Sequence, residues 1–438
     1  MKKTAVLTAL AAITILTSCA EAPKDVISRT ENESVTESLE SKAESDLVFD
    51  TVENVTKNAA SVLENKYQNI VLPDSIEILV TDKAYTLSAS RFDDNVDVTE
   101  QVKKLTKVVC GEEPLSLHAY GVDPPERFLN TLKRAGEDVD EFLKRWSEEN
   151  DGADFYEGFK DQKPLVDEKR CMIAEDPEKY RVEYWSSGTF SVENYGEMGT
   201  DLNAQSSSYA YDVRKDDLNV SYSVGGKDYS LADALSFAEE YVNEKLMPFL
   251  VNDDLVRADK IYVSESKDAQ GQTLGYYYTV TFLHIIDGIP VSDCGEGQMT
   301  SPHMVGTQFY ITIALPDRAG LIGNGMYFAV LEKKPVEKLI TLSSALAKAE
   351  KALAPYGVYN IKRVSLEYCA REEAVSANAV QEDTFYEYHP MWCLTVTEEE
   401  QMENGAPSQR TVLYIDAVSG NIYLWNGKTA TLEIDIND

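Results

Sequence analysis

The chain has 438 residues, a formal net charge of −34, 43% hydrophobic residues and 25 tyrosines. The negative charge argues against nucleic acid as a partner, because phosphate binding requires a basic surface, and against a polybasic contact with a membrane. The hydrophobic fraction indicates a folded chain with a substantial core.

The first residues have the pattern of an export signal. Two lysines precede an apolar stretch over 5–15, which is too short for a permanent transmembrane helix of roughly 20 apolar residues. Residues 16–19 read Leu-Thr-Ser-Cys and resemble the lipobox of bacterial lipoproteins, in which diacylglycerol alkylates the cysteine sulfur and the chain is cleaved before it. We therefore expect a signal peptide over 1–18 and a protein held on the extracytoplasmic face of the cell membrane by lipid on Cys19. The alternative is an ordinary signal peptide in which this cysteine has no role.

Residues 19–61 are expected to form a tether. Between 20 and 50 the sequence is rich in acids, serine and threonine, and its single aromatic residue is Phe49. Such a composition cannot bury enough apolar surface to fold. We expect a disordered, acidic linker that spans roughly 30 Å on average.

The pattern becomes globular at about residue 62, and the sequence predicts an α+β domain of unknown type over 62–225. Helix caps, apolar spacing and breaker residues locate its elements. These are a strand at 76–80, a helix capped by Asp97 that ends at Gly111, a helical stretch after Pro125 that breaks near Gly136, and strands at 181–185, 207–213 and 218–224.

The second half of the chain contains an internal repeat. Residues 230–239 match 341–350 at an offset of 111, with Leu, Ala, Leu, Ala and Glu identical at equivalent positions. Each segment opens with a serine or threonine that can cap a helix, and apolar residues follow at helical spacing. We therefore expect two related units, over 226–335 and 336–438.

Strand-like runs follow both expected helices. A helix followed by an antiparallel meander forms a compact two-layer unit, in which the helix covers one face of the sheet. Asp287-Gly288 is expected to form a hairpin turn, and Ser419-Gly420-Asn421 a second turn. The expected strands lie at 260–263, 276–286 and 308–314 in the first unit, and at 361–368, 391–397, 411–417 and 422–425 in the second.

The motifs of these units resemble a known domain family. The second unit has an Ala-Leu-x-x-Ala-Glu helix at 345–350, then Pro-Met-Trp at 390–392, then Tyr-Ile-Asp-Ala-Val-Ser-Gly-Asn-Ile-Tyr at 414–423. It resembles a PepSY-type domain, and the first unit, through 278–282 and 287–291, is similar but more divergent. Such domains occur in propeptides of secreted metalloproteases and in surface proteins, where they are associated with inhibition or protein binding. The resemblance implies two units that each pack a helix on an antiparallel sheet. The whole layout is also similar to that of uncharacterised lipoproteins of Gram-positive anaerobes.

Five cysteines remain besides Cys19, and an odd, scattered number does not describe a disulfide framework. Cys369 and Cys393 lie in two strand-like runs that could face each other, so a disulfide between them is geometrically allowed. The other interpretation is that both are small buried hydrophobic side chains.

Motifs that indicate catalysis or a bound metal are missing from the sequence. The four histidines are scattered, and no zinc-protease, nucleophile-elbow or P-loop motif is present. His284 lies in an apolar run and is expected to be a satisfied core or edge histidine, and Gly323-Asn324-Gly325 is expected to be a turn. A calcium-loop spacing at 93–97 lacks the glycine and the glutamate that such a loop needs. No cofactor and no metal site is predicted.

Tyrosines concentrate in the expected strands. They could present an aromatic surface for a peptide or glycan, or they could fill a half-exposed sheet, where the ring packs and the hydroxyl stays wet. The second interpretation is the favoured one. The tyrosines concerned are Tyr276, Tyr277, Tyr278, Tyr310, Tyr386, Tyr388 and Tyr414.

These observations favour a non-enzymatic surface lipoprotein whose PepSY-like units bind another protein or a peptide of the cell envelope, with an exposed strand edge as the natural docking place. The rival is a hydrolase acting on wall polymers, with its site in 62–225, which would require a deep cleft with convergent polar groups. A solute-binding lipoprotein is a third class. Such proteins usually have two α/β lobes with parallel sheets, unlike the antiparallel pattern expected here.

Overall fold

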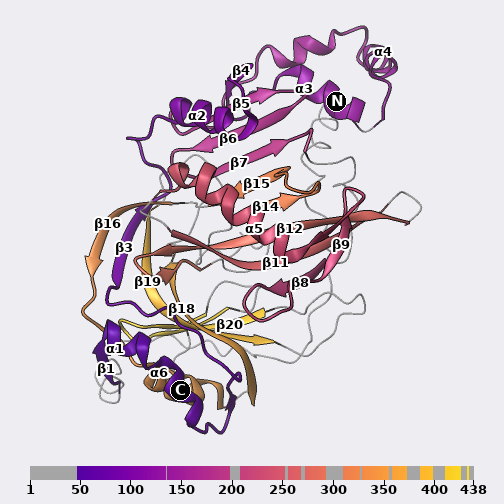
Figure 1. Cartoon of the computed structure of the whole chain (residues 1–438). Helices are drawn as coiled ribbons and strands as arrows, with labels where there is room; N and C mark the ends of the chain where they lie inside the picture. The colour runs from indigo at the N-terminus through magenta and orange to yellow at the C-terminus, as the bar shows by residue number, and fades with distance from the viewer. Residues whose placement is uncertain are drawn as a thin grey trace. The chain divides into compact units, whose positions relative to one another are not determined.

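A computed structural model describes most of the chain after residue 46 (Figure 1). The predicted signal peptide, Cys19 and most of the predicted tether lie outside the described residues. The described ranges are 47–134, 136–197, 208–251, 255–267, 272–292, 309–325, 328–354, 358–371, 385–397, 410–425 and 432–433.

This part of the chain is α+β, as the sequence predicts, and consists mostly of sheet with few helices. Within the described ranges, the helices are α1 (Val52–Lys57), α2 (Val98–Cys110), α3 (Pro125–Arg134), α4 (Val139–Glu149), α5 (Leu231–Tyr241) and α6 (Leu342–Leu353), and the 3-10 or π turns are η2 (Ala59–Glu64), η3 (Phe155–Phe159), η4 (Val242–Leu246) and η5 (Met247–Phe249).

The first of two large sheets combines strands from the middle of the chain. Its described strands are β4 (Ser116–Ala119), β5 (Cys171–Asp176), β6 (Tyr180–Trp185), β7 (Phe190–Asn194), β8 (Ser208–Asp212), β9 (Ser221–Val224), β10 (Lys227–Ser230), β11 (Leu255–Lys267), β12 (Thr273–Ile286), β13 (Ile289–Pro290), β14 (Phe309–Ile313) and β15 (Leu321–Asn324). They run in the order β10-β9-β12-β14-β15-β7-β6-β5-β4, and β11 and β13 also pair with β12, while β8 pairs with β11.

The second large sheet combines strands from both ends of the described chain. Its strands are β2 (Ile70–Val71), β3 (Tyr85–Ser90), β16 (Ala329–Pro335), β18 (Tyr359–Arg371), β19 (Phe385–Thr397), β20 (Arg410–Asp416), β21 (Ile422–Trp425) and β22 (Leu432–Glu433). The order is β16-β3-β19-β20-β21-β22, with β18 between β19 and β2. A separate antiparallel pair joins β1 (Phe49–Thr51) to β17 (Lys338–Ile340).

Two parts of the chain repeat the same order of elements. In what we call the first segment, residues 227–324, β10 leads into α5, and then β11, β12, β14 and β15 pair in succession as antiparallel neighbours. In the second segment, residues 338–425, β17 leads into α6, and β18, β19, β20 and β21 do the same. Ser230 and Thr341 cap the two helices, because each side chain accepts a hydrogen bond from the backbone amide three residues on.

Both segments also share one buried hydrogen bond. The Tyr278 hydroxyl on β12 donates to the carbonyl of Tyr229 at 2.6 Å, and the Trp392 indole on β19 donates to the carbonyl of Ile340 at 2.9 Å. Each accepting residue immediately precedes its helix cap, and both aromatic side chains are fully buried. A buried carbonyl needs such a partner, so this bond fixes the start of each helix on its sheet.

The helices bury their apolar faces in two cores. The first core joins α5 to α2 and the first sheet, and Figure 1 shows α5 lying over strands β11, β12 and β14. The second core joins α6 to α1, η2 and the second sheet. The end of β12 and strand β13 contribute Ile286 and Ile289 to this second core, so the two sheets share apolar contacts.

The predicted tether, residues 19–61, extends too far along the chain. Residues 47–61 include β1, α1 and the start of η2, and Val52, Val55, Ala59 and Val62 are buried in the second core. The average composition of 20–50 hid this apolar spacing, which begins only at the end of that window. The ordered chain therefore starts earlier than the composition predicts.

Strand pairing also crosses the predicted domain limits. β3 lies in the predicted 62–225 domain but pairs with β16 and β19. β4 to β7, from the same predicted domain, instead extend the first sheet through the pairing of β7 with β15. β16 falls within 226–335 yet belongs to the second sheet. Local spacing does not report such long-range pairing, so the predicted limits cut through both sheets.

Several local predictions are confirmed. The Asp97 side chain caps α2, and the helix ends at Gly111, whose φ is +78°. The break between α3 and α4 contains Gly136 with φ +81°. Asp287 and Gly288 have φ values of +48° and +91° and connect β12 to β13, as a tight hairpin turn requires.

Two local predictions are wrong. Residues 76–80 form no strand and pair with none of the strands that the structure describes. Gly323 and Asn324 lie within β15 rather than in a turn. Gly323 faces Tyr310 across the ladder, and a Cβ there would lie 2.5 Å from the tyrosine ring, so glycine makes room for the aromatic side chain.

Candidate functional site

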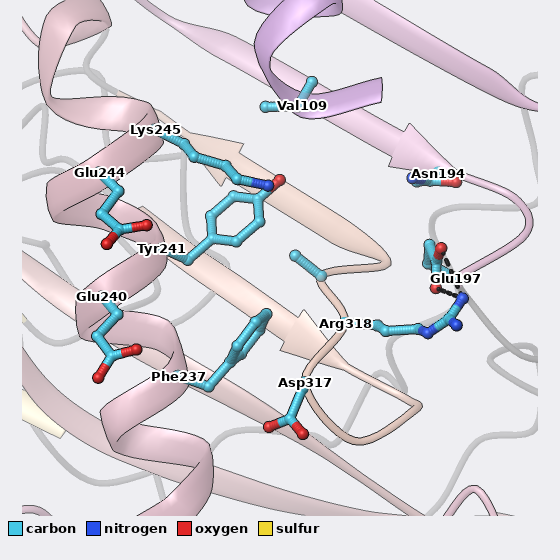
Figure 2. Close-up of a pocket in the computed structure, with 11 residues that line it drawn as sticks. Val109, Asn194, Glu197, Phe237, Glu240, Tyr241, Glu244, Lys245, Asp317 and Arg318 are labelled. Atoms are coloured by element: carbon cyan, nitrogen blue, oxygen red, sulfur yellow. Dashed lines mark hydrogen bonds and ion pairs between the residues drawn. The ribbon is translucent and has the colours of Figure 1, made fainter. Parts of the chain in front are cut away.

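A groove of about 240 Å³ lies between α5 and the turn that joins β14 to β15 (Figure 2). We call it the helix–turn groove. It is lined by Val109, Asn194, Glu197, Phe237, Glu240, Tyr241, Glu244, Lys245, Asp317, Arg318 and Ala319.

One stripe of α5 and the π turn after it form the first wall. Phe237 and Tyr241 lie one helical turn apart, with ring centroids separated by 5.6 Å. In η4 the helix changes from α to π geometry, a change that is frequent at functional sites. Lys245 in this turn places its Nζ atom 4.5 Å from the centre of the Tyr241 ring.

The turn after β14 forms the opposite wall. Asp317 has a left-handed backbone, with φ +60°, and one of its carboxylate oxygens accepts a hydrogen bond from the Tyr229 hydroxyl at 2.9 Å. Arg318 contacts both carboxylate oxygens of Glu197, at 2.9 and 2.8 Å. These bonds tie the turn to the strand that precedes α5 and to Glu197.

Tyr241 is the most enclosed polar side chain of the wall on α5. It is 9% exposed, and its hydroxyl makes no hydrogen bond with the residues that the structure describes. Burial raises the pKa of Tyr241 above its ordinary value, and the nearby Cys110 and Glu197 add to this effect. The hydroxyl is therefore protonated at neutral pH and can donate a hydrogen bond into the groove.

The charges around the groove do not balance. Arg318 is paired with Glu197. Within the described ranges, Glu240, Glu244 and Asp317 have no ion pair with a basic side chain, and Lys245 is the remaining cation. The groove therefore has an excess of negative charge at neutral pH.

The equivalent corner of the second segment is closed. At the offset of 111, Phe237 corresponds to Lys348, whose Nζ atom donates to the carbonyl of Gly420 at 2.6 Å. Gly420 lies in the turn between β20 and β21, and a Cβ there would lie 2.7 Å from Leu47. A lysine and a packed leucine therefore occupy the place that is open in the first segment.

The sequence analysis missed the groove residues. Asp317 lies 76 positions after the end of α5 at Tyr241, and Glu197 lies 34 positions before its start at Leu231. Their approach to the helix depends on sheet pairing that local spacing does not show. A signal was nonetheless present, because Phe237 departs from the repeat where Lys348 stands in the other copy. A large aromatic residue on the polar side of a helix is a departure that indicates an altered surface.

The predicted cysteine pair lies together in the structure. Cys369 and Cys393 are both buried, free thiols, and their sulfur atoms are 3.7 Å apart. A disulfide requires about 2.05 Å between the sulfurs, so the two side chains are not bonded here. Burial, followed by the neighbouring thiol, raises the pKa of Cys393 well above its ordinary value. The predicted lipidation site, Cys19, lies outside the described residues.

A histidine–aspartate pair lies on the same sheet and was not predicted. Nδ1 of His389 is 2.9 Å from Oδ2 of Asp416, which is 3% exposed and also accepts backbone hydrogen bonds from Val418 and Ser419. Burial is the largest single effect and opposes the charge on both groups. Their mutual hydrogen bond and charge attraction, together with Glu387 beside His389 and the backbone amides that bond Asp416, outweigh it, so the pKa of His389 is raised and that of Asp416 is lowered. Cys369 stands opposite His389 in the ladder but is fully buried, which argues against an accessible Cys-His-Asp site.

The 62–225 range, where the rival hydrolase would have its site, contains a buried polar cluster. Nε2 of His118 lies 3.1 Å from Oε2 of Glu175, and Nε of Arg127 lies 3.6 Å from Oε1 of the same carboxylate. Glu175 is fully buried, and the cluster does not line the helix–turn groove. A shallow hollow between α3 and the start of α4 is lined mainly by exposed charged side chains, such as Lys133 and Asp140, and does not include the cluster.

Two further sequence interpretations are confirmed. His284 is fully buried, and its Nε2 atom lies 2.9 Å from Oδ1 of Asn324. The Nδ2 group of the same asparagine donates to the carbonyl of Gly188. His284 is therefore a satisfied core histidine. Most of the strand tyrosines fill the sheets rather than forming an aromatic surface, since Tyr278, Tyr386, Tyr388 and Tyr414 are all buried.

The described residues offer neither a metal site nor a membrane-spanning helix. They contain no group of three histidine, cysteine, aspartate or glutamate side chains that could hold a metal ion. None of the helices in these ranges is long and apolar enough to cross a membrane.

Comparisons with known proteins add little to this geometry. No family model and no curated protein matches the sequence. A crystal structure of an uncharacterized protein from Eubacterium rectale is similar to this chain with a TM-score of 0.47 and 12% identity, and the match covers 84% of this chain and 98% of that chain.

Proposed function

We propose that this protein is an exported lipoprotein, anchored through Cys19 on the extracytoplasmic face of the cell membrane, whose folded body binds another protein or a peptide of the cell envelope without catalysing a reaction. In this proposal the first and second segments are tandem PepSY-like units. The binding site is the helix–turn groove of the first segment.

The observation that carries the proposal is the contrast between the two helix–turn corners. One corner is closed by side chains of the same chain, whereas the other is open and presents aromatic rings, carboxylates and a tyrosine hydroxyl that no described residue pairs with. A concave site with a few convergent polar groups is the usual form of a binding site. The shared hydrogen bonds of Tyr278 and Trp392 support a common origin for the two segments.

The direction of strand pairing favours this proposal over a solute-binding lipoprotein. Nearly all pairings among the described strands are antiparallel, and the parallel ones, β12 with β9 and β18 with β2, involve one or two residue pairs each. Solute-binding lobes are built on parallel sheets. A meander that carries one helix is better suited to display a surface than to enclose a solute.

Affinity capture from the envelope fraction tests the binding function. We expect the full chain, purified in mild detergent and immobilised, to retain a protein or peptide that a matched lipoprotein bait does not retain. Recovery of no such partner, together with clear binding of a small solute, would contradict the proposal.

The anchor requires a separate test. Mass spectrometry of the purified N-terminus is expected to find a lipid-modified Cys19 as the first residue, and Cys19→Ala is expected to release the chain from the membrane fraction. An unmodified N-terminal residue other than Cys19 would refute the anchor and leave the binding proposal to its own test.

A further inference from the structure

We infer that the helix–turn groove binds the positively charged side chain of a lysine or arginine in the partner peptide. This inference rests on the proposed function and names the chemistry by which the partner is recognised. Four observations carry it: the charge, the aromatic surface, the Tyr241 hydroxyl and the closed corner of the second segment. The size of the groove then limits what can enter it.

The first observation is the excess of carboxylates. Asp317 lines the groove from the turn, and Glu240 and Glu244 line it from the helix as exposed carboxylates on the side away from the turn, all without an ion pair to a described basic side chain. The chain as a whole has a formal charge of −34, which attracts cationic partners toward such a groove. An anionic ligand would meet repulsion from the same groups.

The second observation is the aromatic surface between these carboxylates. Figure 2 shows Phe237 between Glu240 on the helix and Asp317 on the turn, while Lys245 lies at the other end, beyond Tyr241. The face of a phenylalanine or tyrosine ring attracts an ammonium or guanidinium group, and Lys245 already makes this contact with Tyr241. The Phe237 ring has no such cation among the described residues, so it is available to a ligand.

The third observation is the unpaired hydroxyl of Tyr241. The Tyr241 side chain is nine-tenths buried and lines the groove, and its hydroxyl has no hydrogen-bond partner among the described residues. The hydroxyl oxygen itself is not fully enclosed, so water reaches it in the free protein, and a bound ligand can replace that water. The carbonyl oxygens of a bound peptide backbone can accept this hydrogen bond, whereas an alkylammonium ion has no acceptor for it.

The size of the groove limits what can enter it. Sites for drug-sized molecules occupy roughly 300–1,000 Å³, whereas this groove measures about 240 Å³. It therefore has room for one long side chain rather than for a folded element.

The fourth observation comes from the chain itself. In the second segment, a lysine ammonium occupies the equivalent corner, where Lys348 donates to the carbonyl of Gly420 at 2.6 Å. The first segment has Phe237 at the matching position and therefore has no cation at that point of the helix, although Lys245 lies farther along the groove. We infer that the partner supplies to the first corner the type of group that Lys348 supplies to the second.

Titration calorimetry with short peptides tests the inference on the full chain in detergent. The probe is acetyl-Gly-Lys-Gly-amide, and its control has norleucine in place of lysine, which keeps the alkyl chain and removes the charge. We expect the lysine peptide to bind about tenfold or more tightly than the control, and we expect added salt to weaken its binding. Equal binding of the two peptides would overturn the inference.

Variants of the groove locate the binding. Glu240→Gln and Asp317→Asn are each expected to weaken the lysine peptide about two- to fivefold, as is usual for exposed ion pairs. Phe237→Ala is expected to weaken it by a similar factor of about two to five, through loss of the cation–π contact. The matched control, Glu148→Gln with Glu149→Gln, neutralises two exposed carboxylates of α4 and should leave binding unchanged. Groove variants that behave like this control would overturn the inference.

Two further experiments distinguish a peptide from a free amine as the source of the cation, and the groove from partner binding in general. If butylamine binds as tightly as the lysine peptide, the inference that a peptide supplies the cation is wrong. In affinity capture, the Glu240→Gln/Asp317→Asn variant is expected to lose the envelope partner that the unaltered chain retains. Equal capture by both would refute the groove as the binding site but leave the binding of an envelope partner standing, whereas capture by neither would refute that binding.

Discussion

The first and second segments share a scaffold and differ at one corner. Both place a helix on a four-strand meander and fix its start with a buried aromatic donor, as the described residues of each show. In the first segment the corner between the helix and the last turn is open beside Phe237, and in the second it is closed by Lys348. A buried hydrogen bond to the residue before the helix cap is present in both segments, whereas the exposed side of the helix differs between them.

The largest expected effect comes from removing the buried aromatic donor of the second segment. Trp392→Ala removes a fully buried indole and its bond to Ile340, and we expect it to lower the free energy of unfolding by about 3–5 kcal/mol. Urea denaturation followed by circular dichroism measures this loss. Val358→Ala, at an exposed position, is the control and should change little. A loss below that of an ordinary surface substitution would show that this bond does not fix the helix.

The same donor can be removed more gently in the first segment. Tyr278→Phe keeps the ring but deletes the hydroxyl that serves both the Tyr229 carbonyl and the Tyr222 amide. Leaving these buried groups unpaired is expected to cost about 1–3 kcal/mol in the same denaturation experiment. Tyr277→Phe, on the neighbouring half-buried residue, is the matched control and should be nearly neutral.

Removing the Lys348 ammonium tests whether this group holds the corner of the second segment closed. Lys348→Met removes the hydrogen bond to Gly420 and is expected to cost about 0.5–1.5 kcal/mol of stability. Lys144→Met, on the exposed face of α4, is the control. If Lys348→Met is as neutral as this control, the lysine does not hold the corner closed.

A pH dependence distinguishes the second segment as well. Three residues before the buried aromatic donor it has His389, whereas the first segment has Gly275 at that place. The raised pKa of His389 gives stability below its ordinary pKa of about 6.5, which is lost as the pH rises through the raised value, and the lowered pKa of Asp416 gives stability that is lost only under acid conditions, below its ordinary pKa of about 3.9. The pair therefore stabilises the fold most between these two values.

Comparing His389→Gln with the unaltered chain measures this contribution. The difference in urea midpoint between the two proteins should be largest near pH 5 and should shrink toward pH 8 and above. A difference that is constant from pH 5 to pH 9 would contradict the assigned direction of the pKa of His389.

The smallest effect concerns the thiol pair. Because the sulfurs of Cys369 and Cys393 are buried and not bonded, we expect iodoacetamide to spare both in the native chain and to alkylate both after unfolding without reductant. Mass spectrometry measures the alkylation of each cysteine. Two cysteines that stay unmodified until a reductant is added would establish the predicted disulfide instead.

The sequence could predict what depends on neighbouring residues. The caps at Asp97 and Ser230, the end of α2 at Gly111 and the turn at Asp287 all follow from local chemistry, and the structure confirms them. The pairing of β3 with β16, by contrast, joins positions more than 200 residues apart and leaves no local pattern. The groove depends on such pairing too, because Glu197 and Asp317 meet α5 only once the first sheet is assembled.

Photo-crosslinking from the two matched helix positions tests most directly whether the open corner is the binding site. The full chain would carry a photoreactive phenylalanine at position 237 in one variant and at position 348 in another, and each would be irradiated with the envelope fraction. We predict a covalent adduct with a protein or peptide from position 237 and none from position 348. Equal adducts from both positions, or an adduct from position 348 alone, would contradict the assignment of binding to the first segment.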